Sequence, residues 1–160
     1  MRYAAMPLLL AGLLAAAVPA REKKEPPPPG PMTEEEKTLL DLVNKERDKE
    51  KLPALKSDDR LRKAARGHSE NMAKQGKLEH VLDGKRPGDR VDAVGYDFSR
   101  LGENIAFNDG GTPEEVVKGW MESKAHRDNI LKKEFKETGV AVATDAKGVK
   151  YITQVFAAPR

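Results

Sequence analysis

The sequence predicts an α+β domain. Most helical patterns lie in residues 33–121, and two short segments of alternating apolar character follow near the C-terminus. When helical patterns come first and strands cluster late, helices usually pack on an antiparallel sheet. The residue pattern alone therefore predicts helices covering such a sheet.

The first 32 of the 160 residues are expected to lie outside the folded domain. Residues 1–20 contain Arg2, an apolar run and a small-residue cleavage site at 18–20, which is typical of a secretory signal peptide. The run is shorter than the roughly 20 residues that span a membrane, so cleavage is favoured over retention as an anchor. Residues 21–32 are charged and then Pro-rich, which predicts an extended linker. We expect a secreted protein, extracellular or periplasmic, with its domain at residues 33–160 and no membrane span after cleavage.

Composition excludes several classes of function. The chain has no cysteine, so disulfides, thiol catalysis and thiolate metal sites are excluded. Its formal net charge is +3, and basic and acidic residues are interspersed along most of the chain. This mixture predicts a solvated surface and no nucleic-acid partner.

Capping signals define the first two helices. Thr33 and Glu36 have the spacing of a capping box, and apolar residues follow at helical intervals until Leu52-Pro53. Residues 57–59 begin a second helix, which Gly76 is expected to end. The buried face of this second helix is predicted to carry Leu61, Ala64, Ala65, His68 and Met72.

Shorter elements complete the chain. A turn at 83–85, a short helix over 87–94 and a strand over 104–107 are predicted in that order. Thr112 and Glu115 form a second capping box with Pro113 at the first helical position. Residues 126–131 are expected to form a loop with a helical turn. Strands over 140–144 and 151–156, joined by a turn at 145–148, predict a hairpin.

The chain has three histidines, at positions 68, 80 and 126, and each can be interpreted as a structural or as a functional residue. His68 lies on the apolar face of the second helix, where a core residue with one hydrogen-bonded nitrogen is favoured. His80 follows the helix end at Gly76 on an irregular segment, where functional residues concentrate. Glu103 is expected in a Gly-Glu-Asn turn, where a carboxylate either fixes the backbone or binds a ligand.

The candidate residues could support two kinds of chemistry, serine catalysis or metal binding. Ser123 and His126 would share a face if the helix continued, but no Gly-x-Ser-x-Gly motif surrounds Ser123, so serine catalysis is disfavoured. Two imidazoles and a carboxylate, from His80, His126 and Glu103, can bind Zn²⁺ with a fourth position open to water. Spacing alone supports this site weakly, because its ligands come from three separate segments.

Several ordered motifs carry a family resemblance. The most specific are Gly-Glu-Asn-Ile-Ala at 102–106 and Trp-x-x-Ser-x-x-His-Arg-x-Asn-Ile-Leu at 120–131. Further motifs lie at 42–55, 61–73, 76–80, 89–96, 139–142 and 151–156. Together they resemble the CAP superfamily, also called the SCP, pathogenesis-related-1 or cysteine-rich secretory protein fold, in its cysteine-free bacterial secreted branch.

The resemblance implies a three-layer α-β-α sandwich with a mainly antiparallel central sheet, in place of two layers. It also implies a cleft over two histidines and two glutamates. His80, Glu103 and His126 match three of these positions, whereas Ser123 occupies the second glutamate position. That departure puts a metal centre with four protein ligands in doubt and leaves a three-ligand site with water. Structural roles are expected for His68, Asn104, Trp120, Arg127 and Asn129.

The family is linked to metal, sterol or lipid binding, to proposed peptidase activity and to host or cell-surface interaction, so it does not assign one reaction. The favoured function is a non-enzymatic secreted domain whose cleft, at His80, Glu103, Ser123 and His126, binds an ion, a small ligand or a cell-surface partner. The first alternative is a metal-assisted hydrolase or peptidase in which Glu103 is a metal ligand or general base and His80 and His126 are ligands or proton carriers. The second is a structural or interaction module without a ligand. Zn²⁺ or another divalent cation is the candidate cofactor.

Overall fold

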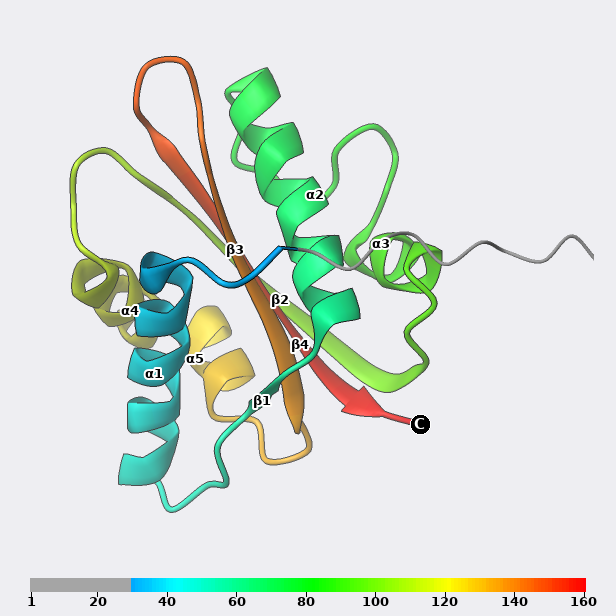
Figure 1. The fold of residues 1–160 in the computed structure, drawn as a ribbon. Coiled ribbons are helices and arrows are strands. Elements are labelled where there is room, and N and C mark those ends of the chain that lie inside the picture. The colour runs from blue at the N-terminus through cyan, green and yellow to red at the C-terminus, as the bar shows by residue number, and fades with distance from the viewer. Residues whose placement is uncertain (1–29) are drawn as a thin grey trace, which may run out of the picture.

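The computed structural model describes residues 30–160, so the predicted signal peptide and most of the predicted linker lie outside the described residues. A four-stranded sheet with strand order β1-β3-β4-β2 separates two layers of helices (Figure 1). One layer contains α1 (Glu34–Lys49), α4 (Pro113–Glu122) and α5 (Lys124–Ile130), and the other contains α2 (Asp59–Gln75) and α3 (Pro87–Ala93). The predicted α+β class and the three-layer α-β-α sandwich are therefore confirmed.

The sheet is mixed. Strands β2 (Phe98–Asn108) and β3 (Glu137–Thr144) each pair antiparallel with β4 (Lys150–Pro159), and β3 and β4 form the predicted hairpin. Strand β1 (Lys56–Ser57) pairs parallel with β3, so the sheet is antiparallel except at this edge. No sequence pattern predicted β1, because two exposed residues contain no alternation. None of the helices within residues 30–160 is both long and apolar enough to cross a membrane.

The helix ends follow the predicted capping chemistry. Capping boxes join Thr33 to Glu36 and Thr112 to Glu115, and Asp58 caps α2. Gly76 ends α2 in the left-handed conformation, with φ of 63°, which a residue without Cβ adopts at little cost. Residues 124–130, which partly overlap the segment expected to be a loop with a helical turn, form helix α5.

Strand β2 differs most from the prediction. It has 11 residues, whereas only 104–107 were predicted, and it pairs with β4 from Phe98 to Asn108, with a register shift between Phe98 and Arg100. Glu103 lies inside this strand opposite Val155, so the expectation that Glu103 occupies a turn was wrong. Pairing with a distant strand determines the length of β2, and local sequence does not report such pairing.

The sheet carries a hydrophobic core on each face. On one face Ile152 and Phe156 pack with residues of α1, α4 and α5, and on the other Val155 and Ala157 pack with residues of α2 and α3. Helix α2 crosses β3 at Gly139, where an added Cβ would lie 2.1 Å from the Leu61 carbonyl carbon. A glycine is required there because no side chain fits between the two backbones.

Arg47 is a fully buried cation in α1. Its guanidinium donates hydrogen bonds to the carbonyls of Pro53, Ile130, Lys132 and Phe135, at 2.7–3.2 Å. Burial lowers the pKa of Arg47 below its usual value, since the charged form is desolvated. This one side chain therefore fixes the segments after α1 and after α5 against each other.

The Arg47→Met variant should lower the free energy of unfolding by at least about 3 kcal/mol, because several buried carbonyls lose their donor. Urea denaturation followed by circular dichroism measures the change. Arg100→Gln, at an exposed position, is the matched control and should change stability by less than about 0.5 kcal/mol. Equal stability of the two variants would show that Arg47 does not have this role.

Candidate functional site

Glu103 is the centre of a buried polar cluster on the α2–α3 side of the sheet. Its side chain is 2% exposed, and both carboxylate oxygens have partners. Arg90 of α3 donates to Oε2 at 2.6 Å, and Nδ1 of His80 lies 2.9 Å from Oε1. The carboxylate is thus held by side chains and not by the turn backbone that the sequence suggested.

Arg90 links Glu103 to the segment that precedes α3. Besides the carboxylate, its guanidinium donates to the carbonyls of His80 at 3.1 Å and Lys85 at 2.9 Å. The guanidinium of Arg90 therefore pairs with the Glu103 carboxylate and also holds the backbone of His80 in place. Sequence reasoning missed this role, because nothing in the local pattern around residue 90 indicates a partner 13 residues away.

His80 presents a free ring nitrogen to solvent. Its side chain is 49% exposed, and a carboxylate next to Nδ1 favours the tautomer in which Nδ1–H donates to Glu103. Nε2 then carries a lone pair and faces away from the carboxylate. The pair has the geometry of an oriented imidazole, as in a metal ligand or a general base.

His68 is buried in α2 beneath the same cluster. Its Nε2 lies 3.8 Å from Oε1 of Glu103, and neither ring nitrogen makes a hydrogen bond of ordinary length and angle. Burial lowers the pKa of His68, and the nearby Glu103 charge and the backbone of Glu79 oppose that shift without reversing it. The ring is therefore neutral near pH 7.

His126 approaches the site from the opposite helix layer. It lies in α5, and burial and then the proximity of His80 lower its pKa. Since β2 is the edge strand of the sheet, the two histidines come from separate layers, and they lie near enough to each other at that edge for His80 to influence the pKa of His126.

Ser123 lies at the junction of α4 and α5, with φ of −90° and ψ of 120°. The helix does not continue through it, so Ser123 and His126 do not share the face of one helix. Both line a cleft of about 390 Å³ beside β2. Its apolar lining includes Leu78, Ile105, Phe107, Val116 and Trp120.

The remaining motif residues bind backbone groups around the cleft. Asn104 donates to the His126 carbonyl at 3.1 Å, and Asn129 donates to the Glu103 carbonyl at 3.2 Å and to Asn104 at 2.9 Å. Trp120 donates to the Ile105 carbonyl at 3.2 Å, and Arg127 donates to that of Met121 at 3.1 Å. These contacts join α4 and α5 to β2.

Sequence and structure comparisons assign the family. The family model described as CAP, the cysteine-rich secretory protein family, matches residues 40–156. The chain belongs to the CAP family. This member contains no cysteine, as the resemblance to the cysteine-free bacterial branch indicates.

Three relatives show how this CAP domain occurs in longer proteins. The chain is 41% identical over 106 residues to the uncharacterized protein YkwD of Bacillus subtilis and 38% identical over 127 residues to the uncharacterized membrane protein YlbC of the same organism. These matches cover 66% and 78% of the chain but only 41% and 34% of the two relatives. A crystal structure of an extracellular protein containing an SCP domain from Bacillus anthracis matches with a TM-score of 0.70 and 29% identity, over 81% of this chain and 45% of that one.

The donor set of this CAP domain differs from that of a metal centre with three or four protein ligands. Within residues 30–160, no three His, Cys, Asp or Glu side chains are arranged to hold a metal ion. The guanidinium of Arg90 lies against Glu103, and a neighbouring cation weakens the attraction of that carboxylate for a metal ion. The free donors of the site are therefore the two imidazoles.

The CAP domain should lose stability as the pH falls from 7.5 to 5.5. The folded pKa values of His68 and His126 lie below the ordinary 6.5, so the unfolded chain takes up protons first as the pH falls through 6.5. The stabilising effect of these two histidines is complete above pH 6.5, and it decreases as the pH falls from 6.5 towards their folded pKa values. Urea denaturation across this range measures it.

The His126→Asn variant should show a shallower dependence of unfolding free energy on pH than the parent protein, and Lys133→Gln, at an exposed position, should show an unchanged dependence. A parent protein equally stable at pH 7.5 and 5.5 would contradict the assignment of depressed histidine pKa values.

Proposed function

We propose that this CAP domain acts outside the cytoplasm as a binding module whose ligand occupies the cleft at Ser123 and His126, next to His80. The observation that carries the proposal is the pairing of Glu103: both its oxygens are engaged within the chain, while Nε2 of His80 remains free. The extracellular location is supported by the signal-like residues 1–20 and by the similarity to an extracellular protein of Bacillus anthracis.

The lining of the cleft indicates the chemistry of its ligand. Phe107 is 60% exposed and Leu78 is 39% exposed, which is high for large apolar side chains beside a hollow. Trp120 forms part of the wall, and its N–H is already bonded to Ile105. We infer a ligand with an apolar body and one polar end that binds the imidazoles.

A divalent cation is a second candidate occupant. Zn²⁺ would bind Nε2 of His80 and the imidazole of His126, while Glu103 would orient His80 from behind, in the manner of outer-shell carboxylates. Two protein ligands hold Zn²⁺ less firmly than the three or four of dedicated sites. Bound Zn²⁺ would supply a positive charge that attracts an anionic ligand end.

Hydrolysis is supported less well than binding. A general base must reach the proton that it removes, and Glu103 is buried with both oxygens paired. His80 is oriented by a carboxylate as a base would be, but the described residues around it supply no nucleophile with a hydrolase motif. A purely structural or interaction role is the remaining alternative.

Occupancy of the cleft can be read from Trp120, the chain's one tryptophan. The dye 1-anilinonaphthalene-8-sulfonate, which has an aromatic body and one anionic group, should bind and accept excitation energy from Trp120. The Phe107→Ser variant should bind it at least about fivefold more weakly, since an apolar wall is lost. Val81→Ser, an exposed apolar position outside the cleft lining, is the matched control and should bind normally.

Calorimetry with ZnCl₂ at pH 7.5 tests whether a divalent cation, as distinct from a ligand with an apolar body, occupies the cleft. The parent protein should release or absorb heat saturably, and the His80→Ala/His126→Ala variant should not. Absence of both dye transfer and Zn²⁺ heat in a folded parent protein would leave the structural role as the explanation of the cluster.

A further inference from the structure

A second hollow lies between α2, α3 and the turn at residues 82–85. It has a volume of about 440 Å³, and its lining shares no residue with the cleft at His126. Small or apolar side chains form its walls, among them Ala64 and Gly67 of α2 and Val94 after α3. The hollow is within the size range of small-molecule sites.

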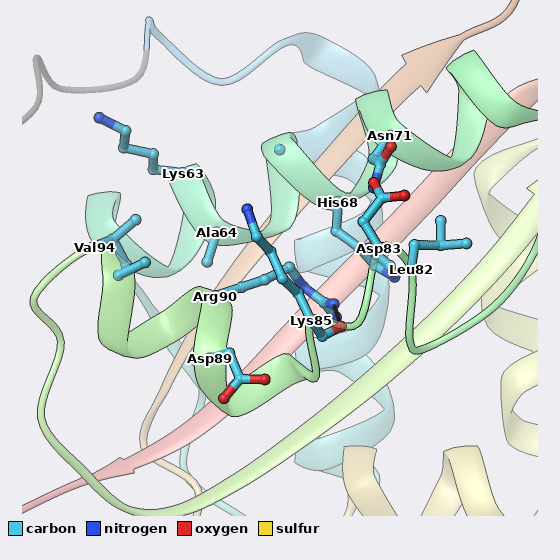
Figure 2. A pocket seen from close by; sticks show the side chains of 12 residues that line it. Lys63, Ala64, His68, Asn71, Leu82, Asp83, Lys85, Asp89, Arg90 and Val94 are labelled. Atoms are coloured by element: carbon cyan, nitrogen blue, oxygen red, sulfur yellow. Dashed lines mark hydrogen bonds between the residues drawn. The ribbon is translucent and has the colours of Figure 1, made fainter.

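His68 contributes to the lining of this hollow from α2 (Figure 2). It is 1% exposed, and neither of its ring nitrogens has a hydrogen-bond partner. A buried polar group without a partner is costly, and native structures usually complete it with a ligand or an ordered water. A neutral imidazole offers one donor and one acceptor.

The acidic residues of the hollow are engaged with donors of the chain itself. Asp83 accepts from the side-chain amides of Asn71 and Gln75, and Asp89 accepts from the Arg86 backbone N–H. These contacts fix the orientation of both carboxylates, which keep their negative charge.

The basic residues are arranged differently. Arg90 is bound to Glu103 and to two carbonyls. Lys85 extends across the hollow towards α2 (Figure 2). An ammonium group over an apolar hollow attracts an anion.

We propose that this hollow is a second binding site, for a small organic anion that combines a short apolar body with one carboxylate. The apolar body lies against Ala64 and Val94, and the carboxylate pairs with Lys85. A polar atom of the ligand, or a water that it retains, completes the hydrogen bonding of His68. The site is separate from the cleft, so it does not depend on the function proposed for that cleft.

The probe is sodium benzoate, titrated into the ¹⁵N-labelled protein and followed by backbone amide shifts. Saturable shifts should be confined to residues 63–71 and 82–94. Benzamide, which has the same shape without the charge, and inorganic phosphate, which has charge without an apolar body, should each bind at least about fivefold more weakly.

Two variants test the assignment. Lys85→Gln should weaken benzoate binding about tenfold, since a charge-assisted hydrogen bond is lost, whereas Lys133→Gln should not change it. Gly67→Leu places a side chain over the hollow at a helical position where an added Cβ meets no atom within 4 Å, so it should abolish binding without unfolding α2.

No saturable shift with benzoate would overturn the proposal. So would shifts confined to the cleft residues, equal binding of benzamide or phosphate, or full binding by Lys85→Gln.

Discussion

Glu103 is a carboxylate buried in an edge strand, and the neighbouring elements are arranged so that its charge is paired. Removing a carboxylate from water is costly unless other groups replace the lost hydration. Arg90 and His80 do so through the side chain, and Asn129 binds the backbone carbonyl of the same residue. These partners lie in α3, in the segment before it and in α5, so one residue connects both helix layers to the sheet.

The same pairing determines what the site can do. Glu103 has no free oxygen with which to bind a metal ion or activate water, and its contact with His80 leaves one oriented ring nitrogen at the surface. Ser123 contributes no carboxylate from the junction of α4 and α5. The cluster thus combines a structural brace on the buried side with two imidazoles on the outer side, which supports the proposed binding role over a hydrolytic one.

The sequence predicted the features that depend on local chemistry. Thr33, Asp58 and Thr112 cap helices because their side chains reach backbone groups a few residues away, and Leu61 to Met72 share a buried face because helical spacing aligns them. The family resemblance supplied the third layer. It also brought Glu103 and His80 together, which no spacing rule would have done.

What the sequence did not reveal depends on contacts between distant segments. The length of β2 comes from pairing with β4, and β1 exists only where it meets β3. The role of Arg90 and the unpaired nitrogens of His68 follow from the packing of α2 and α3 over Glu103, where burial decides which atoms find partners. Helix and strand propensities and hydrophobic periodicity contain no information about hydrogen bonds between distant segments.

Glu103 and Arg90 form one buried, energetically coupled pair that holds the site together. A double-mutant cycle with Glu103→Gln, Arg90→Met and the double variant measures that coupling by urea denaturation. A coupling free energy of at least about 1.5 kcal/mol is predicted, because each single change leaves a buried partner unpaired. Additive effects, within about 0.5 kcal/mol, would show that the two side chains are not coupled.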